Sequence, residues 1–477
     1  MAPPVRLLRN YLTLLAGNVA GQLLFFVGLA HLARMLGPAG FGLWNFAQVW
    51  MLYLLRGGEF GLEVIGVRET ARNPGETPHW IATVVSVRTG LALGLFGAAV
   101  LLSAGGLLPE GSASLVLISA LALFPMAVLL EWVFEGRQEV GLISAARILK
   151  GAVFCAAVLV LVDGSADGEL AAFLYVGALA AGSLFVLVAG VRRFGFRPGA
   201  FSREKAAQAL RMSAPVGIAT LLSQYSLLAA TLMVGYVLGG EPLGYFTAAH
   251  RIVLFLWAYV ITSMHRILLP SLSRSFRDAP SDYGRFVERF FRISVLGALP
   301  AGLVGALAAG PLMEMLYSAR YAESGAVFAI LVWAFVLGTT RSIFEIALIA
   351  ADRQRRYMWG MGLLALLYTI LTPLLTIRFG IVGASWAVLL SELGYCIFLV
   401  VSFPYLDSRR LAGDAWKPVA AAGIGLAVGI LLSPMHGFVR AGAGACVFCL
   451  ALWAFRGVRR EDLDLARTTL GFGRTGV

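Results

Sequence analysis

Long apolar runs, each bounded by charged residues, glycine or proline, recur along the whole chain. A helix that crosses the hydrocarbon core of a bilayer needs about 20 mostly apolar residues, and most of these runs reach that length. We place fourteen spans, at residues 12–35, 41–63, 80–103, 113–134, 142–162, 169–190, 212–238, 243–269, 291–310, 326–350, 357–377, 381–402, 416–433 and 438–455. The first is expected to be an uncleaved helix, because it ends in Leu36-Gly37-Pro38 rather than at a small-residue cleavage site. The pattern predicts an all-α integral membrane protein with fourteen transmembrane helices.

The two halves of the chain resemble each other at a shift of 202 residues. The ungapped matches include Leu8-Arg9 with Leu210-Arg211, Gln22 with Gln224, and Leu36-Gly37 with Leu238-Gly239. Six spans separate the copies, so both have the same orientation in the membrane, as in parallel-repeat transporters. We therefore expect two pseudo-symmetric six-helix lobes, 1–198 and 199–405. Residues 406–477 would add two transmembrane helices and a basic cytoplasmic tail.

Composition narrows the class of protein further. Hydrophobic residues make up 59% of the chain and charged residues 13%, against roughly 25% charged residues in a soluble domain. Such a chain has too few polar side chains to cover a water-soluble surface. Soluble, disordered, coiled-coil and nucleic-acid-binding proteins are excluded on this ground.

The net charge of +12 is explained by membrane topology. With the N-terminus in the cytoplasm, thirty of the 38 basic residues fall in cytoplasmic segments, among them Arg137, Arg147 and Lys150. Only four lie on the opposite side, namely Arg34, Arg320, Arg378 and Arg440. Cytoplasmic loops carry an excess of Lys and Arg. The asymmetry predicts a multi-pass protein of the cell (inner) membrane with both termini cytoplasmic, and it leaves no need for a nucleic-acid partner.

No motif for an established enzymatic chemistry is visible. The three lysines follow Leu149, Glu204 and Trp416, which excludes the Gly-Lys-Ser/Thr of a nucleotide-binding loop. The five histidines form no HExxH pair. We expect no catalytic residue, no metal site, no cofactor and no enzymatic activity. An integral-membrane glycan polymerase or ligase is the alternative from a different class.

Polar side chains follow one face of several predicted spans. At 100° per residue, Asn45, Gln48, Arg56, Glu59 and Glu63 occupy an arc of 80°. Thr247, His250, Arg251 and His265 repeat the arrangement in the eighth span, while Asn18, Gln22 and Gln224 lie in the first and seventh. Ionisable groups in a span usually face a bundle interior or a water-filled cavity. We expect a cavity lined by spans 1, 2, 7 and 8.

From this stripe we select the candidate substrate-binding residues. They are Arg251, Arg56, Arg88, His250, Gln48, Gln22, Asn18, Gln224 and Asn45. Arg251 leads because it lies about eight residues deep, with no acidic residue within one helical turn.

Structural alternatives stay open for several polar residues. Arg56 can pair with Glu59, Arg341 can pair with Glu345, and the amides Asn18, Gln22 and Gln224 can join helices by hydrogen bonds. Glu392 is either a helix contact or a proton or cation site.

Several motifs resemble those of polysaccharide-biosynthesis flippases. These belong to the polysaccharide transporter branch of the multidrug/oligosaccharidyl-lipid/polysaccharide exporter superfamily. The residues that carry the resemblance are Leu32–Gly42 (LARMLGPAGFG), Phe46-Ala47, Phe60-Gly61-Leu62, Val67–Arg72 (VRETAR), Glu131–Glu139 (EWVFEGRQE), and Leu316-Tyr317 with Tyr321. The resemblance covers essentially the whole chain, and the N-terminal motif is its most specific part.

The resemblance implies a flippase that moves an isoprenoid-pyrophosphate-linked oligosaccharide from the cytoplasmic to the outer leaflet by alternating access. A peptidoglycan-precursor lipid flippase and a cation-coupled drug exporter are alternatives within the superfamily. Membrane lipids and the lipid-linked substrate are the expected partners. A coupling proton or cation and glycan polymerase or assembly proteins are further candidates.

The topology can be tested with reporter fusions. We expect fusions at Gly111, Gly240 and Gly437 to report an extracytoplasmic location, because few basic residues flank them. Fusions at Gly199, at Arg355 and at the C-terminus should report the cytoplasm. An extracytoplasmic signal at Gly199 would contradict the topology, since that connection carries the strongest basic signal.

Overall fold

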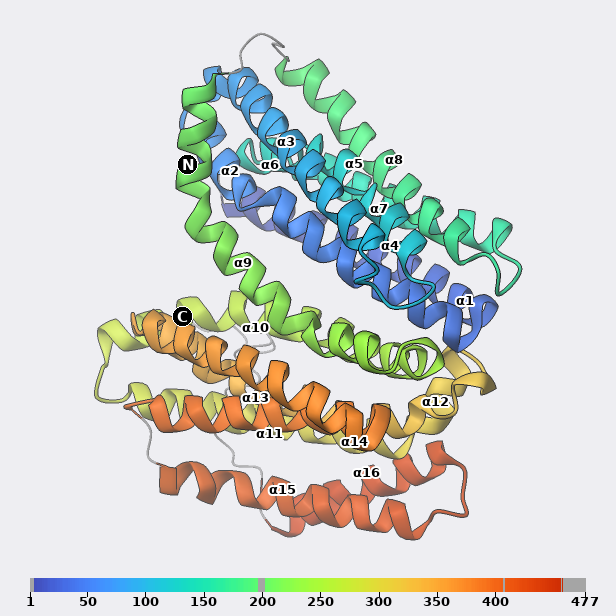
Figure 1. Cartoon of the computed structure of the whole chain (residues 1–477). Helices are drawn as coiled ribbons and strands as arrows, with labels where there is room; N and C mark the ends of the chain where they lie inside the picture. The colour runs from blue at the N-terminus through green and yellow to red at the C-terminus, as the bar shows by residue number, and fades with distance from the viewer. Residues whose placement is uncertain (1–3, 196–201, 406–407, 456, 458–477) are drawn as a thin grey trace. The chain divides into compact units, whose positions relative to one another are not determined.

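A computed structural model describes residues 4–195, 202–405, 408–455 and 457 of the chain, and its regular elements are all helical (Figure 1). The predicted lobe boundary at 198/199, the fusion site Gly199 and the tail after residue 457 lie outside the described residues. The chain divides into two compact units, Met1–Gly244 and Tyr245–Val477. The division into six-helix lobes stays a prediction.

The first unit is built around the long helix α1. α1 packs along α7 and also contacts α9, while α7 packs against α8 (Figure 1). The elements of this unit are α1 (Pro4–Glu59), α2 (Leu62–Arg72), η1 (Pro74–Glu76), α3 (Thr77–Ala104), α4 (Ala113–Ala120), α5 (Leu123–Ala127), α6 (Glu131–Gly136), α7 (Val140–Leu161), α8 (Gly168–Phe194) and α9 (Arg203–Val237).

The second unit is centred on α13, which packs against α14 and α11. α15 and α16 pack on each other and on α11. The elements are α10 (Gly240–Asp278), whose first turn belongs to the first unit, α11 (Tyr283–Leu307), α12 (Ala309–Leu316), η3 (Ala319–Tyr321), α13 (Ser324–Ala350), α14 (Gln354–Ser402), α15 (Ser408–Leu431) and α16 (Gly437–Ala454).

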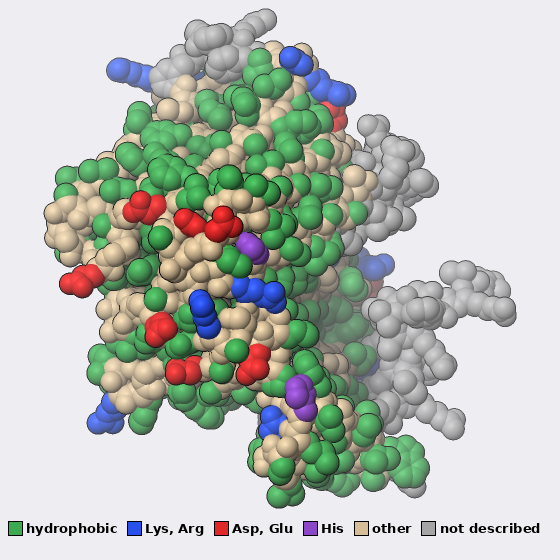
Figure 2. All heavy atoms as spheres, turned by 90° about the vertical axis from the view of Figure 1, so that its right-hand side faces the viewer, with side chains coloured by type: hydrophobic (Ala, Val, Ile, Leu, Met, Phe, Trp, Pro, Cys, Tyr) green, Lys and Arg blue, Asp and Glu red, His purple; other side chains and the backbone are tan. Residues whose placement is uncertain are grey.

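The helices confirm the predicted class of an all-α, multi-pass membrane protein. Eleven helices of the described chain are long and apolar enough to cross a bilayer, and a shorter apolar helix covers Ala415–Leu431. Hydrophobic side chains are spread over the face in view, while several acidic and basic ones gather near its middle (Figure 2). The number of fourteen spans stays a prediction.

Glycines break two of the long helices where the sequence separates successive spans. Gly37 in α1 has φ 66° and Gly380 in α14 has φ 60°, conformations that favour glycine. Pro38 follows Gly37, has no N–H to donate, and restricts the residue before it. Gly239, the counterpart of Gly37 at the 202-residue shift, also has a positive φ, of 58°. The repeat therefore preserves the helix break.

The predicted span 113–134 is a broken helix rather than a continuous one. α4, α5 and α6 follow each other in this region, separated by short turns. Val133 donates to the Leu130 carbonyl instead of that of Leu129. Irregular backbone at membrane depth must find partners inside the protein, and the Leu129 carbonyl accepts a hydrogen bond from Arg88 at 3.2 Å.

Small residues bring α1 and α7 into backbone contact. A Cβ atom added at Gly21 would lie 2.6 Å from the Arg147 carbonyl oxygen, and one at Gly151 would lie 2.3 Å from the Gly21 carbonyl oxygen. Glycines at membrane helix interfaces allow such close approach. The crossing of α1 and α7 therefore depends on the absence of side chains at these two positions.

We expect Gly151→Ala to lower the stability of the purified protein by about 1–3 kcal/mol, the usual cost of overpacking. Gly141→Ala is the matched control on the same helix, because nothing lies within 4 Å of its added Cβ. The measurement is thermal unfolding in detergent, followed by fluorescence-detected size exclusion. Equal melting temperatures for the two variants would show that the α1–α7 contact tolerates a methyl group.

Candidate functional site

Two amides of the α1 stripe are paired inside the first unit. Asn45 and Gln48 are 1% and 3% exposed. The Asn45 side chain donates to the Phe41 carbonyl at 2.8 Å, and Gln48 donates to the Ser119 hydroxyl of α4 at 3.4 Å. Their main observed role is therefore to satisfy neighbouring polar groups within the helix bundle.

Arg56 and Gln224, both predicted site residues, lie together. The Arg56 Nη1 atom is 2.7 Å from Glu59 Oε2, which confirms the pairing considered from the sequence. Arg56 Nε donates to Gln224 Oε1 of α9 at 3.4 Å. The Arg56 side chain remains 46% exposed. It combines a fixed position with an accessible guanidinium.

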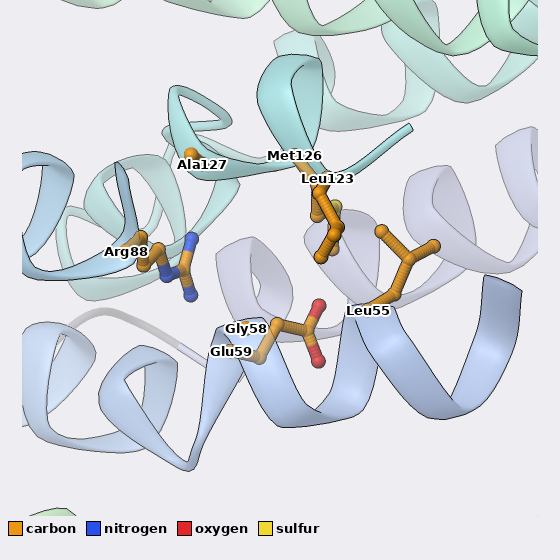
Figure 3. A pocket seen from close by; sticks show the side chains of 7 residues that line it. All are labelled: Leu55, Gly58, Glu59, Arg88, Leu123, Met126 and Ala127. Atoms are coloured by element: carbon orange, nitrogen blue, oxygen red, sulfur yellow. The ribbon is translucent and has the colours of Figure 1, made fainter. Parts of the chain in front are cut away.

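Arg88 borders a small cavity on the other side of Glu59. It is 3% exposed, and only its Nη1 atom has a hydrogen bond within the described chain, whereas Nε and Nη2 are buried without a partner there. Figure 3 shows its guanidinium and the Glu59 carboxylate bordering the same cavity, between α1, α3 and α5. The cavity has about 10 Å³ of free space, room for roughly one water molecule.

Glu59 consequently interacts with two arginines. Its carboxylate pairs with the half-exposed Arg56 and interacts electrostatically with the buried Arg88. A buried, incompletely bonded guanidinium is costly unless a charge or water meets it. This arrangement ties the accessible Arg56 to the interior of the first unit through one carboxylate.

Asn18 and Gln22 do not join the Arg56 cluster. Asn18 Oδ1 accepts a hydrogen bond from Arg147 Nη1 of α7 at 2.6 Å, and Arg147 Nη2 lies 2.7 Å from Glu131 Oε2. Gln22 borders a pocket that also contains Arg147 and Lys150. Sequence reasoning counted Arg147 and Lys150 with a cytoplasmic connection. Both lie inside α7, one of the candidate membrane spans, in agreement with the predicted span 142–162 and against that charge count.

The candidates of the second unit lie near the start of α10. His250 is 2% exposed, and its ring centroid is 5.3 Å from that of Phe246. Arg251 is partly exposed and interacts electrostatically with Tyr317. Burial raises the pKa of the Tyr317 hydroxyl, which therefore stays protonated and donates to the Ala248 carbonyl at 3.2 Å.

A buried charged cluster in the second unit joins residues that the sequence left separate. Arg341 pairs with Glu345, as one reading of the sequence predicted, and its Nε also lies 2.6 Å from Glu392 Oε2. Tyr368 donates to Glu392 Oε1 at 2.9 Å, and the Tyr395 ring centroid lies 4.6 Å from Arg341 Cζ. The lone acid Glu392 was the signal in the sequence, but its partner lies 51 residues earlier.

These geometries suit the binding of anionic groups. An arginine guanidinium offers a planar set of donors that matches phosphate and carboxylate oxygens. Within the described residues, no three His, Cys, Asp or Glu side chains are grouped so that they could hold a metal ion. The accessible guanidinium of Arg56 is the clearest binding element of this set in the first unit.

Comparison with known sequences identifies related proteins. Residues 7–276 match the sequence model of a family described as polysaccharide biosynthesis protein. A putative O-antigen transporter of Escherichia coli (strain K12) is 24% identical over 251 residues, which are 51% of this chain and 60% of that protein. The match thus spans less than two thirds of this relative.

Solved structures show the same fold at low sequence identity. A lipid II flippase MurJ in an inward closed conformation is 12% identical with a TM-score of 0.72, over 94% of this chain and 98% of that chain. An inward-facing multidrug resistance MATE family transporter of the MOP superfamily is 14% identical with a TM-score of 0.61, over 82% and 95%. At these identities the likeness concerns the fold alone.

Arg341→Met should destabilise the protein by about 3–5 kcal/mol, since it would leave two carboxylates buried without their cation. Arg353→Met, at an exposed position just after α13, is the matched control and should melt as the wild type does. Adding Glu345→Gln and Glu392→Gln to Arg341→Met should restore much of the lost stability. Thermal unfolding in detergent measures all three, and an unchanged melting temperature for Arg341→Met would contradict the role of the cluster.

Proposed function

The chain belongs to the polysaccharide biosynthesis protein family, and on this basis we propose that it is a flippase for a lipid-linked oligosaccharide. It would move an isoprenoid-pyrophosphate-linked glycan from the cytoplasmic to the outer leaflet by alternating access. The observation that carries the proposal is the family match over residues 7–276. The similarity to a putative O-antigen transporter and the series of apolar helices agree with it.

The arginines in the membrane helices suit the transport of an anionic head group across the bilayer. A glycan head with a pyrophosphate is polar and charged, so it cannot cross hydrocarbon without partners. Arg56 and Arg251 are at least partly exposed, while Arg88 supports Glu59 beside Arg56. We assign to Arg56 in the first unit and to Arg251 in the second, each by itself, a contact with the anionic head. Arg88 would support Glu59 beside Arg56, and Gln224 would orient Arg56.

The remaining candidates take lesser roles in this proposal. Asn45 and Gln48 in the first unit and His250 in the second are buried and would each support the helix that carries the neighbouring arginine, whereas Asn18 and Gln22 line a separate pocket. The activity would be transport without catalysis, in the inner membrane, with both termini cytoplasmic. Coupling to a proton or cation, and contact with glycan polymerase or assembly proteins, belong to the same proposal.

Loss of the gene tests the function directly. A deletion strain should accumulate lipid-linked glycan that is accessible only from the cytoplasmic side, because synthesis would continue while translocation stops. Mass spectrometry of the extracted lipids identifies the intermediate. Accumulation of a peptidoglycan precursor would favour that alternative, and accumulation of unpolymerised glycan on the outer side would favour a polymerase or ligase.

Arg251→Ala should abolish glycan export in the deletion strain, because alanine removes a membrane-embedded positive charge from α10. Arg251→Lys should retain part of the activity if charge is what matters, and little if a bidentate fork is needed. Arg274→Ala, at an exposed position of the same helix, is the control and should export normally. With equal expression by blot, wild-type export by Arg251→Ala would remove Arg251 from the binding face.

A further inference from the structure

A second polar pocket lies inside the first unit, apart from Arg56 and Arg88. It is bordered by α1, α7 and α8, with about 100 Å³ of free space, room for several water molecules. Its polar side chains are Asn18, Gln22, Arg147, Lys150 and Tyr175. All three helices are candidate membrane spans, and the hydrocarbon around such a span supplies no hydrogen-bond partner for polar side chains.

The close approach of α1 and α7 places these side chains. Gly21 and Gly151 let the two backbones touch. Asn18 and Gln22 occupy the same face of α1, because residues i and i+4 are neighbours on a helix, and Arg147 and Lys150 are likewise neighbours on α7. The contact between the two glycines therefore places the amide pair of α1 opposite the cationic pair of α7.

Lys150 is the unusual member of the pocket. It is the eleventh residue of the 22-residue helix α7, about 15 Å from either end at 1.5 Å per residue. Among the described residues, no hydrogen bond or ion pair involves its ammonium group, the Gln22 amide or the Tyr175 hydroxyl. A charged or polar group within a membrane is costly unless something meets it.

The two cations of the pocket, Arg147 and Lys150, differ in how they are paired. Arg147 is neutralised by Glu131 at 2.7 Å and is further held by Asn18. The carboxylates of Glu135 and Glu63 also act on Arg147 electrostatically, whereas no ion pair of the described chain involves Lys150. Phe25 and Tyr175 form one wall, with ring centroids 5.7 Å apart. Aromatic faces of this kind pack against the apolar C–H face of a sugar ring.

We propose that this pocket is a binding site for an anionic oxygen group of the glycan head, with Lys150 as its charged ligand. Gln22 and Tyr175 would supply hydrogen bonds, and Phe25 would contact the adjoining sugar. The inference rests on the proposed function for the identity of its ligand. The anionic group is either the phosphate of the lipid linkage or the carboxylate of an acidic sugar, and these two sources can be separated by experiment.

The chain offers a direct probe, because it contains three lysines, at positions 150, 205 and 417. We would treat the full-length protein in lipid nanodiscs with formaldehyde and cyanoborohydride, a reagent small enough for the pocket. Mass spectrometry of the peptides then gives the rate of dimethylation at each lysine. Lys205, whose side chain is 41% exposed, and Lys417 are internal controls.

Lys150 should be modified in the free protein and protected several-fold by inorganic pyrophosphate or by glucuronate, with the controls unchanged. Protection by pyrophosphate alone assigns the pocket to the lipid linkage, and protection by glucuronate alone assigns it to an acidic sugar. Glucose at the same concentration should not protect. Absence of modification, absence of protection by either anion, or equal protection by glucose would overturn the proposal.

Export assays give an independent readout. Lys150→Met keeps the length of the side chain but removes its charge, so export should fall, whereas Lys150→Arg should restore it and Lys205→Met should have no effect. Melting temperatures close to that of the wild type would separate a binding role from a structural one.

The flippase proposal and the pocket proposal can be refuted separately, because labelling does not depend on transport. A deletion strain that accumulates no lipid-linked glycan would refute the flippase, while full export by Lys150→Met without protection would refute only the pocket.

Discussion

The cost of a charge inside a membrane helix governs the polar structure of this protein. Arg56, Arg88, Arg147, Lys150 and Arg341 all lie on candidate membrane spans. Each needs a counter-charge, a hydrogen-bond acceptor or water, because hydrocarbon supplies none of these. The unit interiors are arranged accordingly, with carboxylates, amides and freed carbonyls placed on facing helices. What distinguishes the sites is how completely each cation is satisfied.

The guanidinium of Arg341 is buried and fully paired, whereas that of Arg56 is paired but still accessible. Arg341 is 7% exposed and contacts two carboxylates and an aromatic ring, so its donors are used within the protein. Arg56 has one carboxylate and one amide but remains 46% exposed. A guanidinium that is held in place yet accessible can exchange a contact with water for a contact with an anion at little cost in ordering. This difference separates a structural cluster from a binding element.

The sequence predicted the all-helical membrane class and the local pairs, because both depend on near neighbours. The helix break at Gly37 and its repeat at Gly239 were visible as a matched Leu-Gly, and the pair Arg341–Glu345 as an i, i+4 spacing. The contact of Arg341 with Glu392 was not predictable, since it joins α13 to α14 across 51 residues. Lys150 was misassigned for another reason: it was counted with the cytoplasmic connection although the predicted span 142–162 already contained it.

The two halves of α1 serve different neighbourhoods, and the break at Gly37 separates them. Before the break, Gly21 brings α1 against α7, and Asn18 contacts Arg147. After it, Arg56 contacts α9 and Glu59 borders the cavity of Arg88. Had α1 been one continuous helix, its polar positions would have formed a single periodic stripe, as helical periodicity alone suggests. Because the non-helical Gly37 changes the direction of the chain, the stripe is divided, and one helix contributes to two distinct polar sites within the first unit.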